Sequence, residues 1–371
     1  MEFSNEDRRL MMKALSLAAR GRGMVHPNPM VGAVVVKDGA VAGAGFHHGP
    51  FHPHAEVVAL AQAGESARGS TLYVTLEPCN HQGRTPPCTE AIIDAGVERV
   101  VIAATDPNPS VRGGGEERLR AEGLRVQCGL LAERSARLNE AYEKYVTTGM
   151  PLIIVKMAAT ADGKVATRGG ASKWISGDKA RKMVHAMRRE SDAVLVGRGT
   201  VEHDDPELTV RKVPLRGAKP PLRVVVDSHL SMLLDCKLAR GGEPLVIVAT
   251  TAEHDRDKAR VMQERGVRVL ELTGSRKQVD LRELMKALGK MEVAQLLVEG
   301  GPTLVASLLE EGLADRLALF VAPKVFGDVK ARSWLEGREV SDPARGFPMV
   351  WRRARKVGED LLLEADIGGG A

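Results

Sequence analysis

The stretch PCNHQGRTPPC, from Pro78 to Cys88, holds two of the four cysteines of this 371-residue chain, with eight residues between them. It follows STLYVTLE, which has the apolar residues of a short buried strand, and it runs into CTEAIIDAG, which has the pattern of a helix. Upstream, HPHAEVVAL places His54 and Glu56 at the beginning of another helix. One histidine, one glutamate and two cysteines are thus expected at the ends of neighbouring elements.

These residue types predict a catalytic zinc site. His54, Cys79 and Cys88 offer one nitrogen and two sulfur ligands, which leaves one position of a tetrahedral Zn²⁺ for water. The partial positive charge at a helix N-terminus favours the thiolate form of a cysteine there. Glu56 would take a proton from the zinc-bound water and pass it to a leaving amine. The order His-x-Glu, Pro-Cys and a second cysteine is typical of zinc deaminases, although these usually have only two residues between the cysteines.

Each of these residues has a structural interpretation when it is taken alone. His54 is then a helix N-cap, Glu56 a first-turn partner of the helix dipole, and the two cysteines small core residues. The four residues together, in this order, favour zinc. Four cysteines are too few for a disulfide scaffold, so Cys128 and Cys236 are interpreted as core residues.

The composition excludes several classes of protein. Hydrophobic residues make up 43% and charged residues 27%, as in an ordinary globular protein. The longest apolar runs, such as PLIIV and PLVIVA, have the length of strands, and the polar start MEFSNEDRRL is no secretory signal, so we expect a cytoplasmic location and no membrane partner. A net charge of +5 fits a phosphorylated small molecule at least as well as nucleic acid, and 3% aromatic residues offer few platforms for stacking bases.

The order of the patterns predicts two α/β domains. Strand and helix patterns alternate from NEDRRLMMKALSLAARG to LRVQCG, which favours a sheet with helices on both faces, and MVGAVVVKDGAVAGAGF has the pattern of a hairpin that turns at Asp38 and Gly39. Pro151 opens a second series of strand patterns with helical stretches between most of them. We place the boundary so that the domains comprise residues 1–147 and 148–371.

The segment LVEGGPTLVASLLEEG carries the strongest local signal of the second domain. A buried strand ends at Glu299, two glycines let the backbone approach closely, and Pro302 and Thr303 begin a helix whose N-terminus suits a phosphate group. A tight strand–helix connection without a ligand is the structural alternative. In the first domain, GGGEERL lacks the GxGxxG spacing of a dinucleotide fingerprint and is interpreted as loop geometry.

The segments PNPMVGAVVV, HAE, PCNHQGRTPPC and DPNPSVRGGG resemble the deaminase half of the bifunctional riboflavin-biosynthesis deaminase–reductases. The second half resembles their reductase, so that the resemblance covers most of the chain. The long cysteine spacing and GRTPPC distinguish this family from the tRNA-adenosine and cytidine deaminases, which are otherwise similar. The resemblance implies a cytidine-deaminase-like three-layer α/β/α domain with zinc, followed by a dihydrofolate-reductase-like α/β domain with NADPH.

The resemblance also implies two reactions on one phosphorylated aminopyrimidine. In the first, zinc hydroxide would deaminate 2,5-diamino-6-(5-phosphoribosylamino)pyrimidin-4(3H)-one at the ring carbon that carries the 2-amino group. In the second, NADPH would deliver a hydride to C1′ of the opened ribose and leave a ribityl chain. By matching position, the substrate contacts of the deaminase are Asn28, His47, His81 and Arg84. Their structural alternatives are a turn for Asn28 and exposed loop positions for His47 and Arg84.

In the reductase, the resemblance implies that Lys156 and Glu299 supply or steer the proton, with Asp204 as an alternative. Arg188 and Arg211 have the fork geometry that suits a phosphate dianion. The substrate positions are Ser172, Arg188, Leu208, Arg211 and Glu299. The cofactor positions are Ala158, Trp174, Thr200, Asp204, Ser228, Gly301, Pro302, Thr303, Leu304, Val305, Ala306 and Ser307.

Two other functions compete with this interpretation. The first is a zinc deaminase that acts on nucleotides or RNA with an accessory binding domain; the second domain and the scarcity of aromatic residues argue against it. The second is a non-enzymatic protein in which zinc only stabilises the fold, and the presence of Glu56 argues against that. We expect no nucleic-acid partner, and the resemblance implies a homodimer or a higher homo-oligomer.

Overall fold

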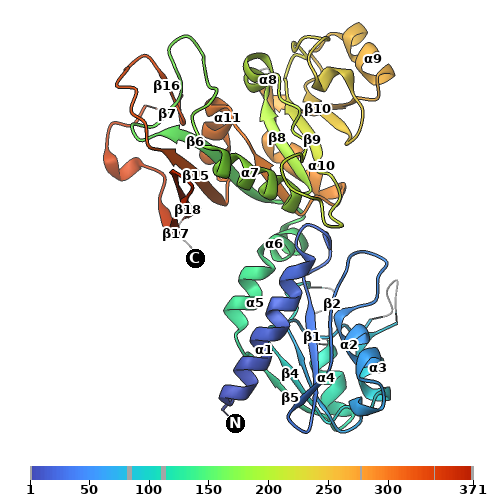
Figure 1. The fold of residues 1–371 in the computed structure, drawn as a ribbon. Coiled ribbons are helices and arrows are strands. Elements are labelled where there is room, and N and C mark those ends of the chain that lie inside the picture. Colours follow the sequence, from blue (N-terminus) through green and yellow to red (C-terminus); the bar gives the residue numbers. More distant parts are fainter. Residues whose placement is uncertain (1, 82–85, 110–113, 276–277, 338, 369–371) are drawn as a thin grey trace. The chain divides into compact units, whose positions relative to one another are not determined.

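The computed structural model describes residues 2–81, 86–109, 114–275, 278–337 and 339–368 (Figure 1). The chain divides into two compact units, Met1–Met150 and Pro151–Ala371, which are described separately. The division falls slightly after the boundary placed at residues 147 and 148, because helix α6 (Glu140–Thr148) continues to that point and ends at the left-handed Gly149. No helix in the described ranges is long and apolar enough to span a bilayer.

The first unit is built on a five-stranded sheet with the order β2-β1-β3-β4-β5. Its strands are β1 (Gly32–Lys37), β2 (Ala40–Phe46), β3 (Thr71–Val74), β4 (Arg99–Ile102) and β5 (Arg125–Cys128). β1 and β2 form the predicted hairpin, with Asp38 and Gly39 at positive φ in its turn. β3, β4 and β5 are parallel, so their carboxyl ends share one edge of the sheet.

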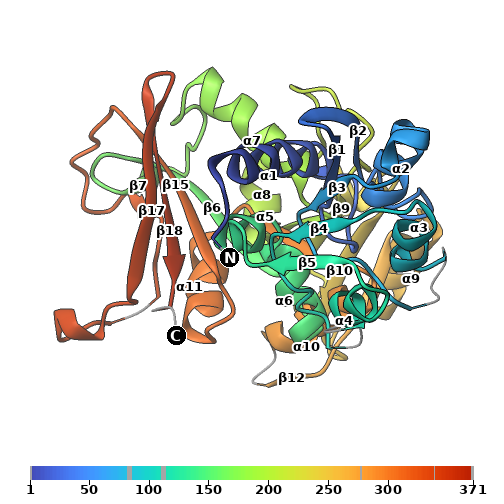
Figure 2. The same cartoon turned by 90° about the horizontal axis from the view of Figure 1, so that it is seen from below.

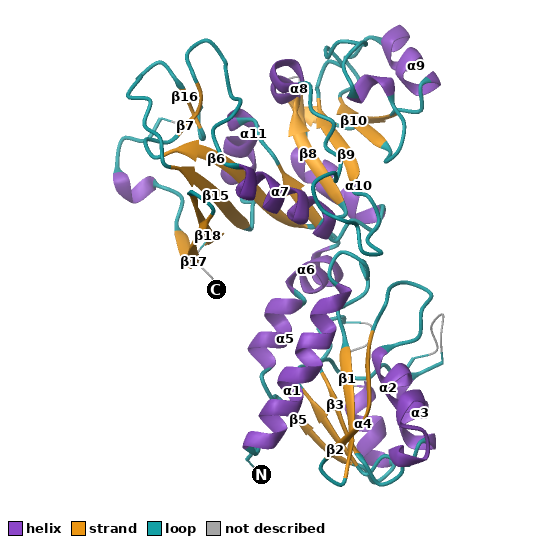
Figure 3. Cartoon of the chain, viewed as in Figure 1, coloured by secondary structure: helices purple, strands orange, loops and turns teal. Residues whose placement is uncertain are grey.

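Helices cover both faces of this sheet, as Figure 3 shows. α1 (Asn5–Ala18) packs Leu10 and Met11 against Val34, whereas α2 (Ala55–Ala63) packs Ala59 on the opposite face against the neighbouring Val35. α3 (Cys88–Asp94) and α4 (Gly114–Ala121) lie on the α2 side, and α5 (Ala132–Leu138) and α6 lie on the α1 side (Figure 1). Because successive side chains of a strand point to opposite faces, one apolar run fills both layers of the core. The predicted three-layer α/β/α domain is confirmed.

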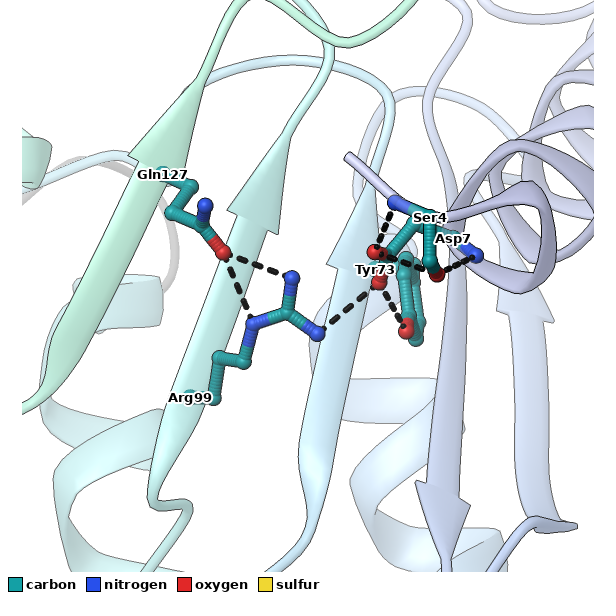
Figure 4. Close-up of polar contacts among 5 residues, drawn as sticks. All are labelled: Ser4, Asp7, Tyr73, Arg99 and Gln127. Atoms are coloured by element: carbon teal, nitrogen blue, oxygen red, sulfur yellow. Dashed lines mark hydrogen bonds and ion pairs between the residues drawn. The ribbon is translucent and has the colours of Figure 1, made fainter. Parts of the chain in front are cut away.

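A buried carboxylate ties α1 to three strands (Figure 4). Ser4 and Asp7 form a capping box in which Ser4 Oγ accepts from Asp7 N at 3.0 Å and Asp7 Oδ2 accepts from Ser4 N at 2.8 Å. Asp7 Oδ1 accepts from Tyr73 Oη on β3 at 2.7 Å and from Arg99 Nη1 on β4 at 2.8 Å, and Arg99 also donates to Gln127 on β5. Burial by itself raises the pKa of Asp7, but the donors Arg99, Tyr73 and Ser4 outweigh it and hold the pKa well below its usual range.

We expect Asp7→Asn to lower the free energy of unfolding of the first unit by about 1–3 kcal/mol at neutral pH, because the hydrogen bonds to a buried carboxylate weaken and the partly buried Arg99 guanidinium loses its counter-charge. The folded-state pKa lies below the unfolded value of about 3.9, so this contribution is present above that value and disappears as the pH falls below it. Urea unfolding of wild type and variant at several pH values measures the effect. Glu6→Gln, at an exposed position in the same turn, is the matched control. A difference that stayed constant into strong acid would contradict the assignment.

The second unit contains a nine-stranded sheet with the order β11-β10-β9-β8-β14-β6-β15-β18-β17. The strands are β6 (Leu152–Thr160), β8 (Ala193–Gly197), β9 (Leu222–Val226), β10 (Val246–Thr250), β11 (Arg268–Glu271), β14 (Gln295–Val298), β15 (Arg316–Ala322), β17 (Met349–Val357) and β18 (Asp360–Ile367). Only β15, β18 and β17 pair antiparallel within it, and Figure 2 shows these three side by side at one edge.

Helices and short elements connect these strands. The helices are α7 (Asp178–Glu190), α8 (Arg198–Asp204), α9 (Arg256–Glu264), α10 (Leu281–Lys290) and α11 (Pro302–Glu310). Two short two-stranded sheets pair β7 (Lys164–Ala166) with β16 (Arg332–Ser333), and β12 (Gly274–Ser275) with β13 (Gln278–Val279). Because β6, β8, β9 and β14 are parallel, their carboxyl ends lie together, and the segments that follow them meet at one edge of the sheet.

Candidate functional sites

The first unit brings together the three predicted zinc ligands. His54 Nδ1, Cys79 Sγ and Cys88 Sγ lie within 4.8 Å of one another, with 3.0 Å from the nitrogen to Cys88 Sγ and 3.5 Å to Cys79 Sγ. A tetrahedral zinc ion with the usual bond lengths separates nitrogen and sulfur ligands by about 3.5 Å. This cluster has no fourth histidine, cysteine or carboxylate among the described residues. The donor set therefore fits one Zn²⁺ with a coordination position open to a small molecule.

Helix N-termini and a hydrogen bond between the two cysteines position the ligands. His54 is the N-cap residue of α2, but its side chain makes no capping hydrogen bond, so the structural alternative for it does not hold. Cys88 is the first residue of α3, and its N–H donates to Cys79 Sγ at 3.3 Å. Hydrogen bonding from Cys88 lowers the pKa of the Cys79 thiol; burial opposes this, and His54 adds to the lowering. A thiolate at Cys79 is thereby favoured, as metal binding requires.

Glu56 is buried beside this cluster without a hydrogen-bond partner for one of its oxygens. The residue is 3% exposed, and its Oε2 has no partner within the part of the chain that the structure describes. Burial is the main cause that raises the pKa of Glu56, and the nearby charges of Cys79 and His54 act on it in opposite directions. Because an unpartnered buried carboxyl group costs free energy, its presence indicates a role towards a bound molecule.

His47 lies beside the zinc ligand His54, and Asn28 lies beside His47. The His47 ring stands edge-on to the His54 ring at 5.4 Å. Its Nδ1 lies 3.3 Å from the carbonyl of Pro53, which can only accept, so the proton belongs on Nδ1 and Nε2 accepts from Asn28 Nδ2 at 3.1 Å. Burial lowers the pKa of His47 to about 4, which keeps the ring neutral. His47 is therefore a buried residue that orients the Asn28 amide, and the exposed-loop alternative is wrong.

The other two predicted substrate contacts of this unit are His81 and Arg84. His81 is exposed in the described part of the cysteine loop. Arg84 belongs to residues 82–85, which lie outside the described residues. Their contacts with the substrate stay predictions.

Sequence reasoning missed Glu77, which precedes Pro78 and is buried. Its Oε1 accepts from the N–H groups of Gly115 and Glu116 at 3.1 and 3.2 Å, and its Oε2 accepts from Asp106 N at 3.3 Å. A Cβ on Gly115 would lie 1.9 Å from the Pro78 carbonyl oxygen, so only glycine fits. Part of the segment interpreted as a glycine loop is thus the first turn of α4, held against the chain that leads to the metal site. The signal in the sequence that could have identified Glu77 is its position between a strand pattern and the Pro78-Cys79 pair.

The second unit contains a cavity of about 850 Å³ at the carboxyl ends of its parallel strands. Most predicted cofactor and substrate residues line it: Ala158, Ser172, Trp174, Arg188, Thr200, Asp204, Arg211, Ser228, Glu299, Gly301, Pro302, Thr303, Leu304 and Ser307. Lys156 lines it as well. Because β6, β8, β9 and β14 end at this edge, segments far apart in sequence contribute to one wall.

Three predicted residues have their side chains elsewhere. Leu208, Val305 and Ala306 are buried and do not line this cavity. The helical period of α11 turns Val305 towards the sheet, where it lines a separate apolar cavity of about 200 Å³ with Val155. α11 meets the large cavity with its first three residues and with Ser307, and its N-cap, Gly301, has no side-chain capping bond, which leaves N–H groups for an anion.

A buried ion cluster lies at the floor of the large cavity. Glu299 directly follows β14, and both of its oxygens accept from Arg188: Nε donates to Oε1 at 2.5 Å and Nη2 to Oε2 at 2.9 Å. Lys156 Nζ lies 3.7 Å from Glu299 Oε2. Burial raises the pKa of Glu299, but Arg188 and then Lys156 outweigh it and bring the pKa to about 2. Burial also lowers the pKa of Lys156, and Glu299 opposes that shift.

This geometry changes the expected role of one arginine. Arg188 donates to both oxygens of Glu299 and, through Nη1, to the carbonyl of Thr209 at 2.9 Å. Its fork is therefore occupied by protein groups and is not available to a phosphate dianion. Arg211 lines the same cavity with a side chain that is 54% exposed, and it pairs at 2.7 Å with one residue, Glu207, which is also open to solvent. The structure favours Arg211 over Arg188 for a phosphate contact.

Two contacts shape the side of the cavity where a flat ring system is expected. Trp174 is 66% exposed, and the Arg181 guanidinium lies 4.6 Å from the centre of its ring. Ser172 Oγ donates to Asp204 Oδ1 at 2.6 Å. Trp174 is therefore not a core residue, because a core tryptophan would be buried.

Comparisons with known proteins agree with both units. Residues 4–104 match the cytidine and deoxycytidylate deaminase zinc-binding region, and residues 151–363 match the RibD C-terminal domain. The riboflavin biosynthesis protein RibD of Aquifex aeolicus is 46% identical over 357 residues, which cover 96% of this chain and 97% of that protein. RibD of Escherichia coli K12 is 41% identical over 370 residues, or 96% of this chain and 98% of that protein.

Solved structures give the same result. Acinetobacter baumannii RibD is 37% identical with a TM-score of 0.88, and the alignment covers 98% of this chain and 99% of that one. A Thermotoga maritima protein described as a diaminohydroxyphosphoribosylaminopyrimidine deaminase/5-amino-6-(5-phosphoribosylamino)uracil reductase is 36% identical with a TM-score of 0.86 and the same coverage. The resemblance inferred from PCNHQGRTPPC and its neighbouring segments is confirmed, and the chain belongs to the RibD family of bifunctional riboflavin-biosynthesis deaminase–reductases.

Proposed function

We propose that this chain converts 2,5-diamino-6-(5-phosphoribosylamino)pyrimidin-4(3H)-one in two steps, hydrolytic deamination in the first unit and NADPH-dependent reduction of the ribosyl group to ribityl in the second. The observation that carries the proposal is the buried, unpartnered oxygen of Glu56 beside His54, Cys79 and Cys88 in a member of this family. A site that only stabilised the fold would have no use for that carboxyl group.

In the deaminase, His54, Cys79 and Cys88 hold the metal. Zn²⁺ in this ligand set lowers the pKa of a coordinated water and so supplies a nucleophile at neutral pH. Glu56 accepts the proton of the attacking water and returns it to the leaving amino group, so that one water enters and one ammonia leaves. His47 keeps the Asn28 amide oriented towards the pyrimidine, because its protonated Nδ1 is held by the Pro53 carbonyl.

In the reductase, the described residues divide into a proton carrier, an anion that supports it, and phosphate contacts. NADPH supplies the hydride that reduces C1′. Lys156, whose ammonium is largely buried, donates the proton to the sugar oxygen that is freed when the ribose ring opens. Glu299 remains ionised because Arg188 binds both of its oxygens, and it keeps Lys156 charged and directed towards the cavity.

The large cavity offers two separate binding positions for phosphate groups. We assign the 5′-phosphate of the substrate to Arg211, because its guanidinium is exposed at the wall, and the cofactor phosphates to the beginning of α11 near Thr200. The choice of NADPH over NADH rests on the family. The homo-oligomeric state and the cytoplasmic location expected from the sequence stay predictions.

The proposal is tested by supplying the diaminopyrimidine phosphate with and without NADPH. We expect ammonia release in both cases, and a fall in NADPH absorbance that follows the deamination. Removal of zinc by a chelator should abolish ammonia release, leave reduction of the previously deaminated substrate intact, and change the melting temperature little. Collapse of the fold on chelation would favour a structural metal. Deamination of RNA or a free nucleotide instead, with a steep salt dependence of RNA binding, would support the alternative function.

A further inference from the structure

The segment Pro206–Arg211, which carries the proposed phosphate contact, is held from α7 by two side chains one helical turn apart. His185 Nδ1 accepts the backbone N–H of Arg211 at 3.1 Å, and Arg188 Nη1 donates to the carbonyl of Thr209 at 2.9 Å. Leu208, which directly precedes Thr209, is 1% exposed and has a φ of 55°, a region that leucine rarely adopts. The segment is thus fixed by two hydrogen bonds and one buried side chain.

His185 is suited to act as a permanent acceptor. It is buried on α7, and a backbone N–H can only donate, so Nδ1 carries no proton. The charged groups around it are Arg188 on its own helix, Arg211 and Lys212 on the segment, and Glu299 after β14. Burial first, and then the three cations, lower the pKa of His185 to about 4, whereas Glu299 opposes them. The imidazole is therefore neutral at physiological pH.

We propose that His185 is a positioning residue of the reductase: by accepting the N–H of Arg211, it sets the point from which the Arg211 guanidinium meets the phosphate of the substrate. His185 is not among the residues that line the cavity, so it acts through Arg211. The Arg211 side chain is exposed, and it pairs with Glu207 of the same segment, at 2.7 Å. If the backbone of the segment shifts, the guanidinium therefore shifts with it. This inference rests on the proposed function, because it takes the reductase substrate to carry that phosphate.

Three substitutions test the acceptor atom Nδ1 separately from the size of the His185 side chain. His185→Asn places a carbonyl oxygen close to the position of Nδ1, His185→Gln places it farther out, near the position of Nε2, and His185→Leu has no acceptor. We expect the KM for the phosphorylated substrate to rise about tenfold in the Gln and Leu variants and to stay within about threefold of wild type in the Asn variant. The kcat and the KM for NADPH should change little in all three. If the Leu variant does not fold, the comparison of the KM values of the Asn and Gln variants still tests the proposal.

Two further measurements distinguish positioning from a general structural effect. A substrate that lacks the phosphate should be reduced equally well by wild type and the Gln variant, because Arg211 then has nothing to bind. Hydrogen exchange at the Arg211 amide should be faster in the Gln and Leu variants than in wild type and the Asn variant. This second readout needs no substrate, so it reports on His185 even if the wild type fails to reduce the pyrimidine and the proposed function is wrong. Unchanged exchange, or an equal loss with both substrates, would overturn the inference.

Discussion

Glu56→Gln should bind zinc like the wild type and release ammonia about a thousandfold more slowly. The amide has nearly the shape of the carboxyl group, and the three ligands do not include Glu56, so the metal site should stay intact. What the variant loses is a group that can accept a proton from water and return it to the amine. The unpartnered Oε2 of this buried residue is the atom on which the prediction depends.

Zinc content and ammonia release, measured on the same preparation, test this prediction. Glu65→Gln, at an exposed position just beyond α2, is the matched control and should behave as wild type. Reduction of the previously deaminated substrate should be unaffected in both variants, because the reductase residues belong to the other unit. Full deaminase activity in Glu56→Gln would show that another group transfers the proton, and loss of zinc would show that Glu56 supports the metal site.

Lys156→Met should lower the kcat of the reductase about a hundredfold or more and leave deamination unchanged. Methionine retains most of the length of the side chain but has no ammonium group. Lys156 is the suitable proton carrier because burial lowers its pKa from the ordinary range of a lysine, whereas Glu299 has a pKa of about 2 and no proton to donate at neutral pH. The prediction therefore assigns different roles to two residues that the sequence treats alike.

Steady-state reduction of the deaminated substrate by Lys156→Met checks this assignment, with ammonia release as the internal control. Lys219→Met changes an exposed lysine away from the cavity and should have no effect. A variant with wild-type kcat would contradict the role of Lys156 and favour Asp204, which also lines the cavity, as the proton donor. Equal loss of both activities would indicate unfolding rather than a lost proton carrier.

The zinc site could be predicted from sequence because its chemistry is local. His54 and Glu56 are separated by one residue, and both cysteines belong to one short loop, so the type and spacing of the residues identify the metal. The cavity of the reductase was also predictable in outline, since polar residues after parallel strands meet at one edge. The family resemblance then named residues such as Trp174 and Thr200, which periodicity does not single out.

Other features depended on contacts that no local pattern records. Arg188 has the chemistry of a phosphate ligand, but in the fold its guanidinium binds Glu299, which is 111 residues away. His185 has no motif around it, and its acceptor role appears only because α7 packs beside the segment that ends at Arg211. Glu77 likewise acquires its role from N–H groups that belong to α4.

The amino-acid sequence by itself determined the alternation of strands and helices, the two-domain order and the ligands of the metal, and it predicted the acid–base residue beside them. Each of these follows from residue types at short spacing, because hydrophobic periodicity and ligand chemistry act over a few residues. Only the tertiary structure showed that the Arg188 fork is bound to Glu299, that Glu299 is held ionised beside Lys156, and that His185 accepts the N–H of Arg211. These properties depend on burial and on charges brought close by folding, and a side chain's pKa and free donors are set by its neighbours in space.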